Sequence, residues 1–272
     1  MKTALITGAS RGIGRSIALH LACSGYRVIV NGTRQTQIDE VVAEIIARGG
    51  EAAGYLANVA DPQEVADMFS TTFDTYGPIQ ALIHNAGIVR DRKCARMTEA
   101  EWEAVIAVHL NGGFYCIQQA LNHMADEGGD MILMTSTAGL TGSTGQVNYS
   151  AAKAGLLGMV WTLAEELRGR RVRVNAIAPA ALTDMTRPVI EHLKDKHAAR
   201  NEPLPEFWQI GEADDVARFV VRLLSQPDLE LTGEIFGING TKATRWKKPE
   251  PDYSEDGIER FFAEWNRRKG RN

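Results

Sequence analysis

Three residues in the middle of the chain have the side-chain types and the spacing of a general acid–base site. Tyr149 and Lys153 are four residues apart, and Ser136 precedes Tyr149 by thirteen residues. Residues four apart lie on one face of an α-helix, so the phenol and the ammonium group converge there. A nearby cation favours the phenolate, and we expect Lys153 to lower the pKa of Tyr149 from about 10. The pattern predicts proton transfer by Tyr149; a chance surface pair is the alternative.

A glycine-rich turn near the N-terminus lies where the phosphates of a dinucleotide bind. The sequence Thr7-Gly8-Ala9-Ser10-Arg11-Gly12-Ile13-Gly14 follows an apolar strand and precedes a helical pattern. Glycines let the backbone approach a pyrophosphate, and the helix N-terminus stabilises its negative charge. The spacing TGxxxGxG disfavours a P-loop nucleotidase, which needs GxxxxGKS or GxxxxGKT. A tight turn without a ligand is the alternative.

Short apolar strands alternate with helices along the rest of the chain. We predict strands over residues 1–6, 27–30, 52–56, 81–84, 131–135, 172–176 and 234–238, and helices over 13–24, 38–48, 99–124, 149–167 and 214–224, with another helix beginning at Asp61-Pro62. This alternation predicts one α/β domain over residues 1–241, a Rossmann fold. Its doubly wound parallel sheet has about seven strands, with helices on both faces.

Two segments do not fit the alternation. Residues 186–210 are polar apart from Phe207-Trp208, and they form either a lid over the active site or a solvated helical excursion. Residues 242–272 form a C-terminal extension with an aromatic helical stripe of Ile258, Phe261, Phe262 and Trp265. We expect this stripe to pack on the body or on a neighbouring subunit, a separate module being the alternative.

Composition excludes several classes of function. The chain has 272 residues and a net charge of −4, which gives no electrostatic reason to expect a nucleic-acid partner. No apolar run is long enough to span a membrane, and the N-terminus does not resemble a signal peptide. The three cysteines, Cys23, Cys94 and Cys116, form no CxxC or CxxH motif, and this sparse set is typical of a cytoplasmic protein. All three lie in apolar segments, so we expect their thiols to be buried. No metal site is predicted.

Together these motifs resemble those of the short-chain dehydrogenase/reductase family over residues 1 to about 240. The resemblance includes the glycine loop, the sequence His84-Asn85-Ala86-Gly87, Ser136, the Tyr149–Lys153 pair and Asn175-Ala176-Ile177-Ala178-Pro179. It implies that Tyr149 donates a proton, Ser136 hydrogen-bonds the substrate oxygen and Lys153 holds the nicotinamide ribose. The implied cofactor contacts are Gly8, Ser10, Arg11, Gly12, Ile13, Gly14, Thr33, Arg34, Asn58, Val59, Asn85, Ala86, Gly87, Tyr149, Lys153, Pro179, Ala180 and Thr183.

The end of the second strand predicts NADPH rather than NADH. NAD-binding Rossmann sites place an acid there to hold the ribose 2′-hydroxyl, whereas a 2′-phosphate requires cations. Here Gly32 takes the place that resembles the acidic position, and no acid follows in Thr33-Arg34. Arg11 and Arg34 can both approach a phosphate, because guanidinium groups bind phosphate in a bidentate fork. The alternative is that both arginines are ordinary surface cations.

One position departs from the family pattern. In Val108-His109-Leu110-Asn111-Gly112, His109 takes the place of the family's fourth catalytic residue, an asparagine. Asn111 is turned about 200° around the helix and is not expected to substitute for it. His109 either maintains the proton relay through its ring nitrogens or leaves it weakened. The sequence Val108-His109-Leu110 before Gly112 is similar to that of enzymes acting on hydroxyacyl thioesters.

A 3-oxoacyl thioester is the leading substrate. Arg168, Arg170, Arg171 and Arg173 could meet an acyl carrier protein, but the acidic stretch 125–130 opposes an acidic partner, so a CoA-linked or free ketone stays competitive. A solvated helix end is the alternative for the arginines. Alternative functions are NAD-dependent oxidation of a secondary alcohol or hydroxyacyl-CoA, and non-catalytic dinucleotide sensing. Apolar residues in 99–124 and 149–167 exceed one buried stripe and predict a homo-oligomer, a dimer or tetramer.

Overall fold

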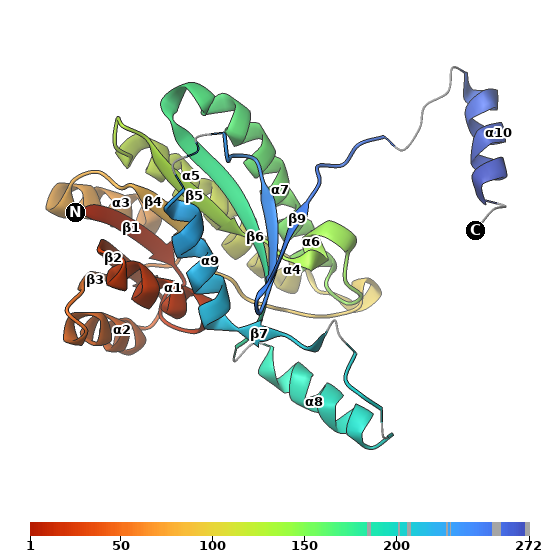
Figure 1. Ribbon diagram of the computed structural model, residues 1–272, viewed down its shortest axis with the longest axis horizontal. Helices are drawn as coiled ribbons and strands as arrows, with labels where there is room; N and C mark the ends of the chain where they lie inside the picture. Colours follow the sequence, from red (N-terminus) through yellow and green to blue (C-terminus); the bar gives the residue numbers. More distant parts are fainter. Residues whose placement is uncertain are drawn as a thin grey trace.

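Seven parallel strands form the centre of the fold in the computed structural model, which describes residues 1–183, 186–200, 202–205, 208–226, 228, 230–251 and 257–269. In spatial order they are β3 (Glu51–Leu56), β2 (Tyr26–Gly32), β1 (Lys2–Thr7), β4 (Ala81–His84), β5 (Gly129–Met134), β6 (Val172–Leu182) and β8 (Ile235–Asn239). The predicted doubly wound Rossmann fold is confirmed (Figure 1). Two strands were not predicted: β7 (Gly211–Glu212) pairs with the end of β6, and β9 (Lys242–Trp246) pairs antiparallel with β8.

Helices cover both faces of the sheet, and alternation along each strand feeds two cores. One core packs β1 residues Ala4 and Ile6 against α1 (Gly12–Cys23), α2 (Gln35–Ala47) and α9 (Ala213–Leu224). The other packs Leu5 against α3 (Pro62–Tyr76), α5 (Gly112–His123) and α7 (Val147–Glu166). Successive side chains of a strand point to opposite faces, so one apolar strand supplies both cores.

The helix predicted over 99–124 is correct in extent but not uniform. It begins as α4 (Glu99–Ile106), passes through a π-helical turn (Ala107–Asn111) and continues as α5. In this turn the N–H of Gly112 donates to the carbonyl of Ala107, five residues back instead of four. A π-turn inserts one extra residue into the helix and is not visible in a hydrophobic periodicity.

Several short elements were also not predicted. They are the helix α6 (Thr137–Thr141) and the 3₁₀ turns η1 (Cys94–Arg96) and η3 (Arg168–Arg170). Strand β6 extends past the predicted residue 176 to Leu182, carrying its carboxyl end farther toward the glycine loop. Within the described part of the chain, no helix combines the length and apolarity needed to cross a membrane.

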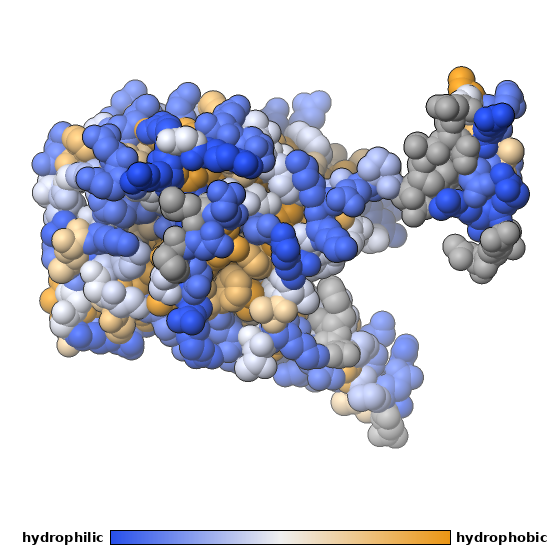
Figure 2. All heavy atoms as spheres, turned by 45° about the horizontal axis from the view of Figure 1, so that its top comes forward, coloured by the Kyte–Doolittle hydropathy of each residue, from blue (hydrophilic) through white to orange (hydrophobic). Residues whose placement is uncertain are grey.

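Two segments project from the body (Figures 1 and 2). Helix α8 (Arg187–Ala198) follows β6 as a helical excursion, and its role as a lid stays a prediction; Phe207 lies outside the described residues. Helix α10 (Ile258–Lys269) stands apart from the body, with Phe262 56% and Trp265 50% exposed. Packing of this stripe on the body or on a neighbouring subunit stays a prediction.

The expectation of three buried thiols is wrong for two of them. Cys116 is buried on α5, and burial raises the pKa of its thiol. Cys23 and Cys94 are exposed. Cys23 is the last residue of α1 and Cys94 lies in η1 between β4 and α4, so both occupy element ends where apolar neighbours in the sequence do not enforce burial.

Candidate active site

The predicted site residues come from loops that follow parallel strands and meet at one edge of the sheet. The glycine loop follows β1, the Asn85-Ala86-Gly87 turn follows β4, and Ser136 follows β5. The strand order reverses between β1 and β4, and ligands of doubly wound sheets bind at such a reversal. The topology therefore brings the acid–base residues and the phosphate loop to the same edge.

Ser136 and Tyr149 lie next to each other. Ser136 caps the short helix α6, its Oγ accepting from the N–H of Ala138 at 3.2 Å, and its hydroxyl lies near enough to the Tyr149 phenol to act on the pKa of that phenol. Tyr149 lies in the first turn of α7, where its N–H donates to Oδ1 of Asn148 at 2.8 Å. Thr135 turns away, donating from Oγ1 to the carbonyl of Lys153 at 3.0 Å. Ser136, and not Thr135, is therefore the hydroxyl that lies beside Tyr149.

Lys153 does not act on Tyr149 as the sequence predicted. Its Nζ lies 5.6 Å from the centre of the Tyr149 ring and donates to the carbonyl of Met134 at 2.5 Å. Burial raises the pKa of Tyr149, and the nearby Ser136 hydroxyl opposes this rise without reversing it. Burial also lowers the pKa of Lys153 to about 7, which weakens the cation itself. The expected lowering of the Tyr149 pKa is wrong, because desolvation outweighs the charge.

His109 lies inside the site, on the π-helical turn. Its ring stands edge-on to the ring of Tyr149, with centroids 5.1 Å apart at 89°. Nε2 lies 2.8 Å from the carbonyl oxygen and 3.0 Å from the nitrogen of Ile88. Burial, with the nearby Lys153 charge, lowers the pKa of His109 to about 2, so the ring is neutral. Asn111 is exposed and does not replace it, as its position on the helix predicts.

The glycine loop is fixed by contacts that exclude larger residues. Gly8 has φ +61° and Gly12 has φ +55°, a region that glycine adopts without strain. A Cβ on Gly14 would lie 2.3 Å from the carbonyl oxygen of Gly8, so the loop must close tightly onto the start of α1. Asn85 holds this arrangement, donating from Nδ2 to the carbonyls of Gly8 at 3.0 Å and Thr7 at 3.2 Å.

The helices nearest the loop begin without a side-chain cap, as α5, α7 and α8 also do, whereas α3 and α4 are capped. Asp61 caps α3 and Thr98 caps α4 with their own oxygens, satisfying first-turn N–H groups. Arg11 and Arg34, at the N-caps of α1 and α2, make no such hydrogen bond, and neither first turn contains an acid. Uncapped N–H groups at a positive helix end are suited to an anion, so the site fits a dinucleotide pyrophosphate.

The remaining predicted cofactor residues border the same region. Thr183, just after β6, lies against the glycine loop, since a Cβ on Gly12 would meet its Cγ2 at 3.6 Å. Pro179 and Ala180 lie in β6 itself. Asn58 is exposed after β3, and Val59 is buried beside Gly112 of α5. Ser10, Ile13, Thr33 and Ala86 occupy the loops and helix starts between these positions.

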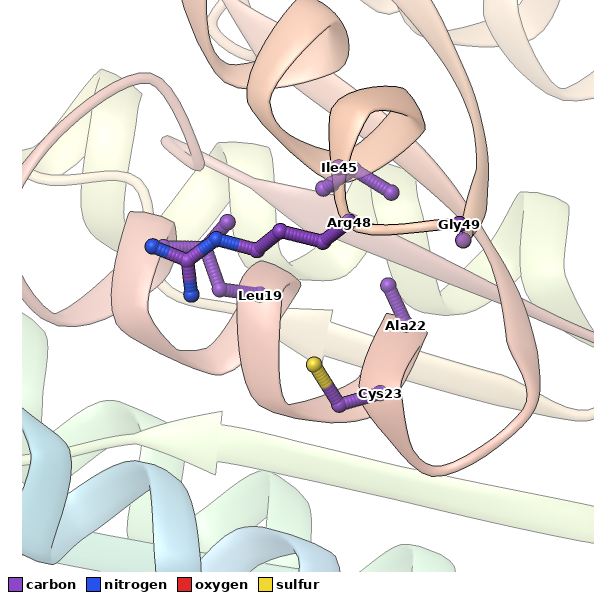
Figure 3. Close-up of a pocket in the computed structure, with 7 residues that line it drawn as sticks. Leu19, Ala22, Cys23, Ile45, Arg48 and Gly49 are labelled. Carbon is purple, nitrogen blue, oxygen red and sulfur yellow. The ribbon is translucent and has the colours of Figure 1, made fainter.

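A small cavity elsewhere carries none of this chemistry (Figure 3). It lies between the ends of α1 and α2 and is lined by Leu19, Ala22, Cys23, Ile45, Arg48, Gly49 and Gly50. Arg48 is paired with Glu44 there. Because these residues lie at the C-terminal ends of α1 and α2, the cavity is at the opposite end of both helices from the phosphate loop.

The arginine cluster that was expected to meet an acyl carrier protein lies at the edge of the sheet opposite the site. Arg173 is the second residue of β6, opposite the carboxyl end that carries the site. It is buried, its Nε lies 2.6 Å from Oδ1 of Asp130, and its Nη1 donates to the carbonyls of Gln226 and Asp228. Arg168 is paired with Glu165. Arg173 joins β6 to Asp130 of β5 and to the chain after α9, and the cluster lies at the edge of the sheet opposite the site.

The sequence analysis missed His84 as part of the site. It was quoted within the Asn85-Ala86-Gly87 motif, but no role was assigned to it. His84 is fully buried between the glycine loop and His109, contacting Oγ1 of Thr7 and the carbonyl of His109, each at 3.2 Å. A histidine at the end of an otherwise apolar strand, adjoining the NAG turn, was the available signal.

Comparison with known proteins identifies the class. A model of the short chain dehydrogenase family matches residues 2–194, and the chain belongs to this family. It is therefore an oxidoreductase acting on CH–OH groups, as the motifs predicted.

Individual relatives agree over nearly their whole length. The chain is 43% identical over 243 residues to a 3-oxoacyl-(acyl-carrier-protein) reductase of Synechocystis sp., covering 88% of this chain and 96% of the relative. It is 37% identical to the reductase of that name from Thermotoga maritima over 241 residues, again 88% and 96%. The crystal structure of a short chain dehydrogenase from Mycobacterium avium superposes with a TM-score of 0.81 at 36% identity, covering 94% and 88%.

Proposed function

We propose that this protein reduces a 3-oxoacyl thioester to the 3-hydroxyacyl thioester with NADPH. The observation that carries the proposal is that the half-buried Ser136 and Tyr149 side chains lie next to each other, with the ring of His109 against Tyr149, beside an uncapped glycine loop. The names of the relatives, 3-oxoacyl-(acyl-carrier-protein) reductases, support the same substrate class. Tyr149, Ser136, Lys153 and His109 are the proposed catalytic and positioning residues.

The reaction needs a proton at the carbonyl oxygen as that oxygen gains negative charge. Burial raises the pKa of Tyr149, so its phenol stays protonated at neutral pH and is in the form that donates. Ser136, beside the phenol, hydrogen-bonds the same substrate oxygen and so orients it toward the proton of Tyr149. The reduced nicotinamide supplies the hydride when bound. Lys153, whose pKa is lowered to about 7, holds the nicotinamide ribose.

The start of α2 supports NADPH as the cofactor. A Cβ on Gly32 would lie 3.0 Å from Oγ of Ser10, so the glycine loop fills the space in which an acidic side chain would hold a ribose 2′-hydroxyl. Arg34 is exposed at the uncapped start of α2, and Arg11 is exposed at the start of α1. A 2′-phosphate placed between these helix ends would meet two guanidinium groups and no neighbouring acid of either first turn.

A basic loop near Tyr149 supports an acidic carrier protein as the bearer of the substrate. The basic loop, residues 90–96, is exposed and contains Arg90, Arg92, Lys93 and Arg96 against one acid, Asp91; Arg92 pairs with Glu101, so Arg90, Lys93 and Arg96 provide the net positive charge. It is anchored next to the site, because Asn148 donates from Nδ2 to the carbonyl of Arg90 at 3.0 Å and the N–H of Arg92 donates to Gly145 at 2.7 Å. Complementary charge at such a position steers an acidic partner.

The function is tested by following NADPH consumption with one 3-oxoacyl chain presented on an acyl carrier protein, on CoA and on a short thiol. We expect turnover of all three with the wild type. Substituting both Lys93→Glu and Arg96→Glu should raise KM about tenfold for the carrier form alone. Arg168→Glu, on the distant η3 turn, is the matched control. No reduction of any thioester by the wild type would overturn the proposal.

Cofactor choice is tested at the two ends of α2. Arg34→Ala should raise KM for NADPH about tenfold while leaving KM for NADH within about twofold, since it removes one charged phosphate contact. Arg48→Ala at the far end of α2 controls for the loss of a surface arginine. A wild type that prefers NADH would refute this part of the proposal.

A further inference from the structure

A buried imidazole that no step of the proposed reaction uses lies directly beneath the site. His84 is the last residue of β4 and is fully buried. Its Nδ1 lies 3.2 Å from Oγ1 of Thr7, and its Nε2 lies 3.2 Å from the carbonyl oxygen of His109. One side chain thus connects the end of β1, where the glycine loop begins, with the π-helical turn.

The surrounding donors determine which ring nitrogen of His84 carries the proton. Oγ1 of Thr7 accepts from the N–H groups of Asn85 and Ala86, each at 3.0 Å. A hydroxyl oxygen has two acceptor positions and one hydrogen, so the hydrogen of Thr7 is left to donate to Nδ1 of His84. Nδ1 is then an acceptor, and Nε2–H donates to the carbonyl of His109. Burial lowers the pKa of His84 to about 3, in agreement with a neutral ring.

This donor acts on the irregular part of the helix. In the π-helical turn, backbone hydrogen bonds reach five residues back, as the bond from Gly112 to Ala107 does. A π-turn costs stability relative to a regular helix and is common at functional sites, where surrounding contacts maintain it. The side chain of His109, on this turn, contacts Ile88 and the Tyr149 ring.

Two glycines leave room for the two rings. A Cβ on Gly113 would lie 3.3 Å from Nε2 of His84, and a Cβ on Gly87 would lie 2.4 Å from Cε1 of His109. Nδ1 of His109 is buried without a hydrogen-bond partner among the described residues. The position of the His109 ring therefore depends on close packing, on its contact with Ile88 and on the backbone of His109, whose carbonyl is bound by His84.

We propose that His84 is a positioning residue: by donating from Nε2 to the carbonyl of His109, it fixes the π-helical turn that holds the His109 ring against Tyr149. Its effect on turnover rests on the proposed function, but its structural part does not. A displaced turn would shift the ring beside the proton donor, and small displacements of a catalytic group cost rate.

The tautomer of His84 is measured in the wild-type protein by ¹⁵N–¹H correlation of the imidazole nitrogens. His84 is assigned by the signals that His84→Ala removes. We expect a protonated Nε2 and an unprotonated Nδ1 from pH 6 to 8. A protonated Nδ1 would overturn the proposal, and this result needs neither substrate nor turnover.

The consequence for the site is measured with His84→Ala and His84→Asn. We expect His84→Ala to shift the ring signals of His109 and Tyr149 and to lower kcat about tenfold or more, with KM for NADPH within about twofold. The amide of His84→Asn can donate to the same carbonyl and should restore part of kcat. His123→Ala is the matched control, because His123 also bonds a carbonyl on α5, that of Gln119, but at the far end of the helix.

The outcomes separate this inference from the proposed function. A folded His84→Ala protein with unchanged ring signals of His109 would overturn the positioning role, whatever the substrate. A wild type that reduces no thioester would overturn the proposed function, while the tautomer and the ring signals still decide the role of His84. If His84→Ala does not fold, His84→Asn and the wild-type tautomer provide the same decision.

Discussion

The two helices α7 and α10 both carry apolar residues at helical spacing, but those of α7 are buried and those of α10 are largely exposed. On α7, Leu156 and Val160 are fully buried against the sheet. On α10, Phe262 and Trp265 are half exposed, and the helix stands apart from the body (Figure 1). An apolar stripe states that a helix needs a partner surface, but it does not say whether that surface belongs to the same chain. The two helices also differ in function, because the first turn of α7 carries Tyr149, the proposed proton donor.

The largest effect is expected at that first turn. Tyr149→Phe should lower kcat by about 10²–10⁴-fold, the range for removal of a general acid, because the ring stays while the proton is lost. The free energy of unfolding should stay within about 0.5 kcal/mol of the wild type. NADPH oxidation under saturating ketone measures the first, and urea unfolding the second. Turnover within twofold of the wild type would show that another group delivers the proton.

Matched truncations test the two stripes directly. Leu156→Ala should destabilise the protein by about 2–5 kcal/mol, because it opens a cavity in a closed core. Phe262→Ala should change the free energy of unfolding of the monomer by less than about 0.5 kcal/mol, because the ring is already exposed. Both are measured by urea unfolding at low protein concentration. Equal losses would mean that α10 packs on the body in solution.

Acid should weaken the site before the rest of the fold. His84 and His109 have pKa values lowered to about 3 and about 2 by burial and by the Lys153 charge, whereas both titrate near 6.5 when unfolded. Below pH 6.5 the unfolded chain therefore binds protons that the folded chain does not. Stability is complete above pH 6.5 and is lost as pH falls, at about 1.4 kcal/mol per pH unit for each ring.

Urea unfolding at pH 7.0 and 5.5 measures this loss. His109→Asn and His84→Asn should each remove part of the difference between the two pH values. His123→Asn, which removes a half-buried imidazole distant from the site, should leave the difference as in the wild type. If all three variants lose the same stability as the wild type on acidification, neither buried ring is the source of the acid sensitivity.

Features with local causes could be predicted from the sequence, whereas features that depend on distant residues could not. The seven parallel strands and the glycine loop could be predicted because periodicity and turn chemistry are local. Ser136 and Tyr149 lie close together because the parallel topology brings the carboxyl ends of the strands to one edge of the sheet. The pKa of Tyr149 could not be predicted, because burial depends on all neighbouring elements and outweighs Lys153. The π-helical turn was equally hidden, since it depends on His84, twenty-five residues from His109.

The placement of Arg173 shows the same limit at the other edge of the sheet. In sequence it belongs to a basic cluster, yet its partners are Asp130 and the carbonyls after α9. Charge in a sequence does not specify which end of a strand carries it toward a ligand. The strand direction specifies this, and the four arginines precede or begin β6 whereas the site follows it.

The smallest effect is expected from removing α10 itself. A chain ending at Pro251 keeps β9 in the sheet, so its free energy of unfolding as a monomer should change by less than about 0.5 kcal/mol. We also expect light scattering to give the same oligomeric state for this chain as for the full chain, above the 29.8 kDa monomer.

Phe114→Asp is the contrasting variant, because Phe114 is 47% exposed on α5 and belongs to the helices predicted to form the main interface. It should give a monomer. If truncation alone gives the monomer and Phe114→Asp does not, then the stripe of α10 is the principal contact with the neighbouring subunit, and the apolar residues of α5 and α7 serve only the core.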